Sequence, residues 1–147
     1  MAEYRDALKS LHTTLVDSKK GYEEALADAE GKGLTPLFRD MIALREKNHA
    51  ELDTLLRAAG ETPDESGSFL SLVHKTIFKV RSVFNGLDES VLPGLIDGET
   101  RIADAYEDVL GNTPPAEASA ALDRQLNALR GKISEMQALR DRAEAKA

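Results

Sequence analysis

Glu46 and His49 are the residues of this chain whose types and spacing best suit metal chemistry. They lie three positions apart, so on a helix they share one face and can reach the same ion. A Glu-x-x-His pair on a helix is half of the ligand set with which some four-helix bundles hold two metal ions. The second Glu-x-x-His of that set is absent from the sequence. The sequence therefore indicates a helical fold and leaves the function open.

The composition is that of one globular domain spanning residues 1–147, with 41% hydrophobic and 31% charged residues. A net charge of -7 argues against nucleic acid as a partner, because binding it requires a basic surface. The chain has no cysteine, which excludes disulfides and thiolate ligands. No apolar run is long enough to suggest a membrane span or a leader segment, so we expect a cytoplasmic protein with no membrane partner.

Apolar residues that recur at steps of three and four predict five helical segments, and no segment has a strand pattern. We expect Thr35 to cap the second helix, Gly60 to end it and Thr113 to cap the last one. From Arg140 onward the chain is charged, and we expect it to fray. The predicted helices cover about residues 4–30, 36–59, 68–85, 91–110 and 114–139.

Short loops predict that the first two helices are antiparallel neighbours, and likewise the last two. The segment 68–85 would be about 27 Å long at 1.5 Å per residue, enough to return along a bundle. A ferritin-like bundle needs such a connection because its second and third helices run parallel. We therefore predict an all-α fold, a ferritin-like up-down-down-up four-helix bundle with an additional crossover helix.

Ionisable residues interrupt three of the four apolar stripes near their middles. Asp17 and His49 lie equally far from the first loop, so they fall at one level of the bundle, and Glu99 lies about one turn away. Carboxylate and imidazole ligands suit iron, manganese or zinc. One interpretation is therefore a metal site whose ligands are Asp17, Glu46, His49 and Glu99.

The alternative interpretation is a buried salt-bridge network, in which Arg45 pairs with Asp17 or Glu99 and His49 is a hydrogen-bonded core residue. Lys132, beside the stripe of the last helix, could then neutralise a carboxylate.

The remaining histidines and two tyrosines have plainer interpretations. We expect His12 at a helix surface and His74 in a structural hydrogen bond. Tyr22 and Tyr106 are expected to pack in the core with hydrogen-bonded hydroxyls.

Residues spread along the chain have an order and spacing that fit one known family. They are Asp17, Gly21, Tyr22, Phe38, the Arg45 to His49 region, Gly67, His74, Lys75, Gly98, Glu99, Tyr106, Gln125, Leu139, Arg140 and Asp141. In these residues the chain resembles a family of small bacterial ferritin-like four-helix-bundle proteins of unknown function, distantly similar to rubrerythrin. The resemblance covers most of the chain and implies the ferritin-like fold and oligomers. The chain departs from the family pattern at Ile77, where tryptophan is usual, and in the last helix, which lacks a histidine.

These observations favour a stress-related or interaction protein with a degenerate polar centre over an enzyme. The alternative is a metal-binding protein with ferroxidase-like or peroxide-reducing activity at the four residues named above. A purely structural dimer is the third option. We also expect a homodimer through the crossover helix, because apolar residues such as Leu72 and Val83 widen its apolar arc beyond one buried stripe.

Overall fold

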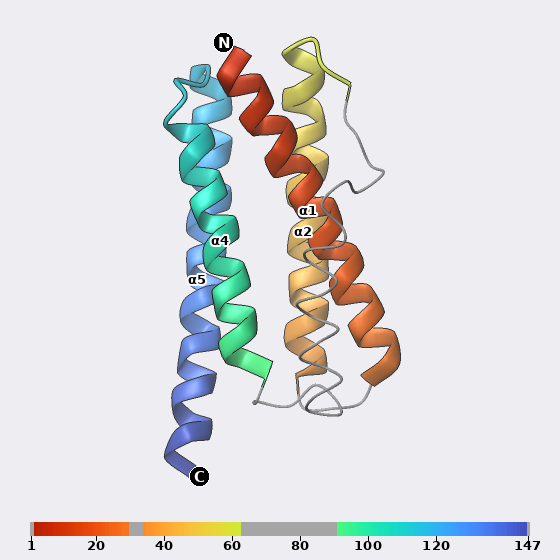
Figure 1. Cartoon of the computed structure of the whole chain (residues 1–147), viewed down its shortest axis with the longest axis vertical. Helices are drawn as coiled ribbons and strands as arrows, with labels where there is room; N and C mark the ends of the chain where they lie inside the picture. Colours follow the sequence, from red (N-terminus) through yellow and green to blue (C-terminus); the bar gives the residue numbers. More distant parts are fainter. Residues whose placement is uncertain (1, 30–33, 63–90, 147) are drawn as a thin grey trace.

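The computed structural model describes residues 2–29, 34–62 and 91–146. These ranges contain four helices and no strand, which confirms the all-α prediction. The helices are α1 (Ala2–Ala29), α2 (Thr35–Ala58), α4 (Leu92–Leu110) and α5 (Ala116–Lys146), packed side by side with their axes roughly aligned (Figure 1).

The directions of the four helices follow from Figure 1, where α1 and α5 run from top to bottom and α2 and α4 from bottom to top. Consequently α2 ends at the end of the bundle where α1 begins, whereas α4 begins at the opposite end. The helix expected over 68–85, on which the crossover and dimer predictions rest, lies outside the described residues.

The core is built from the apolar stripes that the sequence predicts. Helix α1 packs against α2 and also against α4, and α4 packs against α5. Fully burying a leucine contributes roughly 1.5–3 kcal/mol relative to leaving it exposed, so these stripes dominate the stability of the bundle. The central buried leucines are Leu8, Leu11, Leu15, Leu52, Leu56, Leu92, Leu122 and Leu129.

The ends of α2 are set by local backbone chemistry. Its N-cap is Leu34, one residue before the predicted cap Thr35, and proline occupies the first turn. At the other end Gly60 has a φ of +82°, as predicted for the residue that stops this helix. The Gly60 amide donates to the Arg57 carbonyl (3.1 Å) and the Glu61 amide to the Leu56 carbonyl (2.9 Å). These two bonds form a Schellman motif, which satisfies carbonyls that the helix itself leaves open.

The turn between α4 and α5 differs from the prediction. Thr113 adopts a φ of 51° and does not cap α5, because the first helical bond runs from the Ser119 amide to the Pro115 carbonyl (2.8 Å). The side chain of Asn112 donates to the Asp108 carbonyl (2.8 Å) and so closes the end of α4.

Helix α5 continues to Lys146, past the point where we expected fraying. Within the described ranges, no helix combines the length and apolarity that crossing a bilayer requires.

Candidate metal centre

Two histidines and one aspartate meet at the α1–α2 interface. His12 comes from α1, whereas His49 and Asp53 come from α2, four residues apart and therefore on one face. Each of the three side chains offers one ligand atom, and these atoms lie within 4.8 Å of one another. The antiparallel hairpin explains the meeting, since His12 lies 17 residues before the end of α1 at Ala29 and Asp53 lies 18 residues after the start of α2 at Thr35.

This cluster extends from the interior to the surface. The His12 side chain is completely buried, and its Nε2 donates a hydrogen bond to Asp53 Oδ1, whose side chain is 24% exposed. The rings of His12 and His49 meet edge to face, with centroids 5.8 Å apart. His12 Nδ1 is buried and has no hydrogen-bond partner among the described residues. The His12 nitrogen that faces His49 and Asp53 is therefore Nε2, which is oriented by the Asp53 carboxylate.

The burial of His12 corrects the expectation that it lies at a helix surface. A single apolar stripe on α1 includes Leu8, Leu11 and Leu15 and leaves position 12 beside it. Because α1 packs against both α2 and α4, its buried arc is wider than one stripe and includes position 12. Asp53 lies four residues after His49, a helical spacing that the Glu-x-x-His pattern does not include.

Two imidazoles and one carboxylate form a ligand set that proteins use for zinc and for non-haem iron(II). Three protein ligands leave at least one coordination position for water or another small molecule. The plainer interpretation is that His12 and Asp53 only form a hydrogen bond that joins α1 to α2. The convergence of two imidazoles and one carboxylate favours the first interpretation.

A surface pocket of about 210 Å³ borders this cluster. His49 belongs to both, and the other lining residues lie on one face of α1, beginning one turn after His12. They are Val16, Lys19, Lys20 and Glu23.

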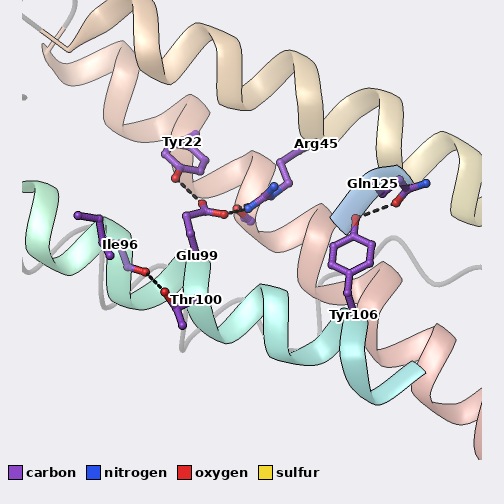
Figure 2. Close-up of polar contacts among 8 residues, drawn as sticks. Tyr22, Arg45, Ile96, Glu99, Thr100, Tyr106 and Gln125 are labelled. Carbon is purple, nitrogen blue, oxygen red and sulfur yellow. Dashed lines mark hydrogen bonds and ion pairs between the residues drawn. The ribbon is translucent and has the colours of Figure 1, made fainter. Parts of the chain in front are cut away.

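Glu99, one of the four predicted ligands, lies in a separate buried network (Figure 2). Its Oε2 accepts a hydrogen bond from the Tyr22 hydroxyl (2.5 Å), and its Oε1 pairs with Nη2 of Arg45. Arg45 also donates through Nε to Ser18 Oγ (3.2 Å). This is the Arg45–Glu99 pair of the salt-bridge interpretation, and it links α1, α2 and α4.

The other predicted ligands are distributed differently. Asp17 is completely buried on α1, whereas Glu46 is exposed on α2. His49 belongs to the cluster with His12 and Asp53. Lys132 pairs with Asp40 (3.4 Å) and Glu135 (3.1 Å) near the surface. The centre formed by Asp17, Glu46, His49 and Glu99 stays a prediction.

Burial governs the protonation of the core network. It raises the pKa of Tyr22 to about 12, against an opposing effect of the Arg45 charge. It likewise raises the pKa of Tyr106 to about 12. Burial also lowers the pKa of Arg45, and the two tyrosines oppose that shift. Both phenols are therefore neutral donors near pH 7, and Tyr106 donates to Gln125 Oε1 (2.7 Å; Figure 2).

Comparison with known proteins gives one family and no described relative. The family model that matches residues 3–112 is DUF2383, a domain of unknown function. Neither curated proteins nor solved structures gave a match.

Proposed function

We propose that this chain, which belongs to the DUF2383 family of domains of unknown function, binds one divalent transition-metal ion. The ligands would be His12, His49 and Asp53. The single observation that carries this proposal is the convergence of three ligand atoms within 4.8 Å of one another. The ligands come from two long helices whose relative position is set by the core, which is the kind of scaffold that holds ligand geometry.

The ligand types narrow the choice of metal. Imidazole and carboxylate suit zinc, iron(II) and manganese(II), and the chain has no cysteine to favour softer ions. His12 Nε2 and Asp53 Oδ1 already point at one another through a hydrogen bond. A bound ion would replace the proton between these two ligand atoms.

A mononuclear site agrees better with the core than a two-metal oxidase does. Two-metal centres in bundles use glutamates from several helices. Both carboxylate oxygens of Glu99 are already engaged, by Tyr22 and Arg45. We therefore propose a metal-binding stress-related or interaction protein rather than a ferroxidase. The helix directions, with α2 parallel to α4, support the proposed ferritin-like topology.

The test is metal binding by matched variants. Protein purified without chelator should contain close to one equivalent of metal by elemental analysis, and the metal-free protein should bind one zinc or manganese ion by calorimetry. Asp53→Asn and His49→Ala should weaken that binding at least about tenfold. Glu46→Gln is the matched control, because Glu46 lies on the same helix three residues before His49 and is exposed.

The outcomes separate the two candidate centres. Loss of binding in Asp53→Asn with normal binding in Glu46→Gln supports the His12, His49 and Asp53 site. The reverse pattern, or a stoichiometry of two, would favour the centre that includes Glu46 and Glu99. No binding of any of these ions overturns both.

A further inference from the structure

The pocket beside His49 has a charge and a position that the metal proposal leaves unexplained. It opens at the surface, and four of its five lining residues occur at positions 16, 19, 20 and 23, which form one face of α1. His49 is the fifth, so one imidazole borders both the pocket and the proposed metal site. A molecule in this pocket would lie next to whatever His49 binds.

The lining is locally cationic in an acidic chain. Lys19 and Lys20 are half-buried and contribute two positive charges, whereas Glu23 contributes one negative charge. The chain as a whole carries a net charge of -7, so this excess is a local property of the pocket. A bound divalent ion at His12, His49 and Asp53 would add further positive charge beside it.

The size of the pocket selects small ligands. Its volume of about 210 Å³ is below the roughly 300–1,000 Å³ of pockets for drug-sized molecules and cofactors. The pocket therefore suits an anion of a few heavy atoms.

We propose that this pocket binds a small oxyanion, such as phosphate or a short carboxylate, which places one oxygen on the metal and another near Lys19 and Lys20. The inference rests on the proposed metal function, because the coordination position left open by three protein ligands supplies one of the two attachment points. The lysine ammonium groups supply the other through charge-assisted hydrogen bonds. Lys19, Lys20 and the metal thus select for negative charge, and the volume selects for small size.

Cobalt(II) tests the two proposals separately, because its visible absorption reports changes in its ligands. The full chain is loaded with cobalt(II) and titrated with inorganic phosphate and, separately, with acetate. Sodium chloride at matched ionic strength controls for general screening. A saturable change in the cobalt spectrum with either oxyanion, and a smaller one with chloride, is the expected result.

Charge-removing variants place the anion in the pocket. Lys19→Gln and Lys20→Gln should each weaken the apparent affinity for phosphate roughly tenfold, since each removes a charged partner. Lys47→Gln is the matched control, because it removes one exposed lysine of α2 that does not line the pocket. All three variants should retain cobalt.

Each failure has its own meaning. If the unmodified protein takes up no cobalt, the proposed metal function fails and the anion site fails with it. If cobalt binds but neither oxyanion alters its spectrum, only the anion site is overturned. The same holds if phosphate binds equally well to Lys19→Gln, Lys20→Gln and Lys47→Gln, because the anion would then lie elsewhere.

Discussion

Arg45 of α2 and Glu99 of α4 form an ion pair in the interior of the bundle, with side chains 0% and 4% exposed. Tyr22 of α1 donates to the same carboxylate, so one glutamate joins three helices (Figure 2). The Arg45 guanidinium and the Glu99 carboxylate are both shielded from solvent, and water can reach them only if the core opens. The pair therefore makes the relative position of the two helical hairpins sensitive to single substitutions.

Glu99→Gln should destabilise the protein by about 3–5 kcal/mol, because it leaves the Arg45 charge buried without its counter-ion. The double variant Arg45→Met with Glu99→Leu should lose much less than the two single variants together, since it removes both charges. Urea unfolding measures these differences. Arg101→Gln is the control, because Arg101 pairs with Asp97 at the surface with both side chains mostly exposed. An equal effect of Glu99→Gln and Arg101→Gln would contradict this prediction.

The buried tyrosines predict a loss of stability at high pH. Tyr22 and Tyr106 have folded pKa values of about 12, above the ordinary value of 10. Between these values the unfolded chain loses phenol protons that the folded chain keeps, so the stabilisation is complete below pH 10 and is lost as pH rises towards 12. Each two-unit shift corresponds to roughly 2–3 kcal/mol.

Phenolate absorbance, followed with pH in native protein and in urea, checks this directly. The native midpoint should lie well above that of the unfolded chain, and burial raises the pKa of the third tyrosine, Tyr4, as well. Tyr22→Phe should flatten part of the decline in stability above pH 10. Coincident native and unfolded titrations would show that the phenols are accessible to solvent.

Gly60 and Gly98 should respond oppositely to alanine. Gly60 has a φ of +82°, which costs a residue with a Cβ about 1–2 kcal/mol, although no atom lies within 4 Å of that position. Gly98 lies inside α4 with equally open space and no positive φ, so Gly98→Ala should stabilise by about 0.5–1 kcal/mol. Thermal unfolding of both variants measures the difference. Stabilisation by Gly60→Ala would contradict the Schellman assignment.

Bound metal should raise the melting temperature of the protein. Zinc at one hundred times its dissociation constant adds about 2.7 kcal/mol to the free energy of unfolding. For a chain of this length that corresponds to a rise of roughly 5–10 °C, which a chelator should reverse. In Asp53→Asn, with affinity at least about tenfold weaker, the same zinc concentration should add about 1.4 kcal/mol or less, so the rise should be at most about half as large. A zinc-induced rise of equal size in that variant would indicate that the ion binds elsewhere.

The association prediction has a separate test. It rests on the apolar arc of residues 68–85, which lie outside the described residues, so the homodimer stays a prediction. Sedimentation at micromolar concentration should give a dimer, and changing Leu72 and Val83 to lysine should give a folded monomer. Sedimentation of the unmodified protein as a monomer would contradict it.

The helical fold could be predicted from the sequence because its apolar residues repeat with one period over long segments. The stripe of α5, which includes Leu122, Leu126 and Met136, is buried as predicted. Helix ends were harder to predict because single bonds decide them. Thr35 and Thr113 both have capping side chains, yet the backbone starts α2 after Leu34 and α5 after Pro115.

The candidate site was less accessible to sequence reasoning. Periodicity identified Glu99 and Arg45 as core residues, and their pairing was one of two interpretations left open. His12 was missed because a single-stripe description of α1 omits the second helix against which α1 packs. In the antiparallel hairpin, positions 12 and 53 lie at one level, just as positions 17 and 49 do. The same geometry that paired Asp17 with His49 could therefore have paired His12 with Asp53. Spacing along the sequence placed Glu99 in the core. It could not show whether Glu99 pairs with Arg45 or binds a metal, because that depends on the directions of the side chains.

All three proposed metal ligands belong to a single hairpin, and this has a consequence for how the molecule opens. Helices α1 and α2 contain His12, His49 and Asp53, whereas α4 and α5 contain none of them. Proteins open in cooperative units whose amide hydrogens exchange with solvent at different rates. An ion bound within one hairpin would slow exchange along α1 and α2 and leave the opening of α4 and α5 nearly unchanged. The ion would thus divide the bundle into a slowly exchanging half and a more rapidly exchanging half.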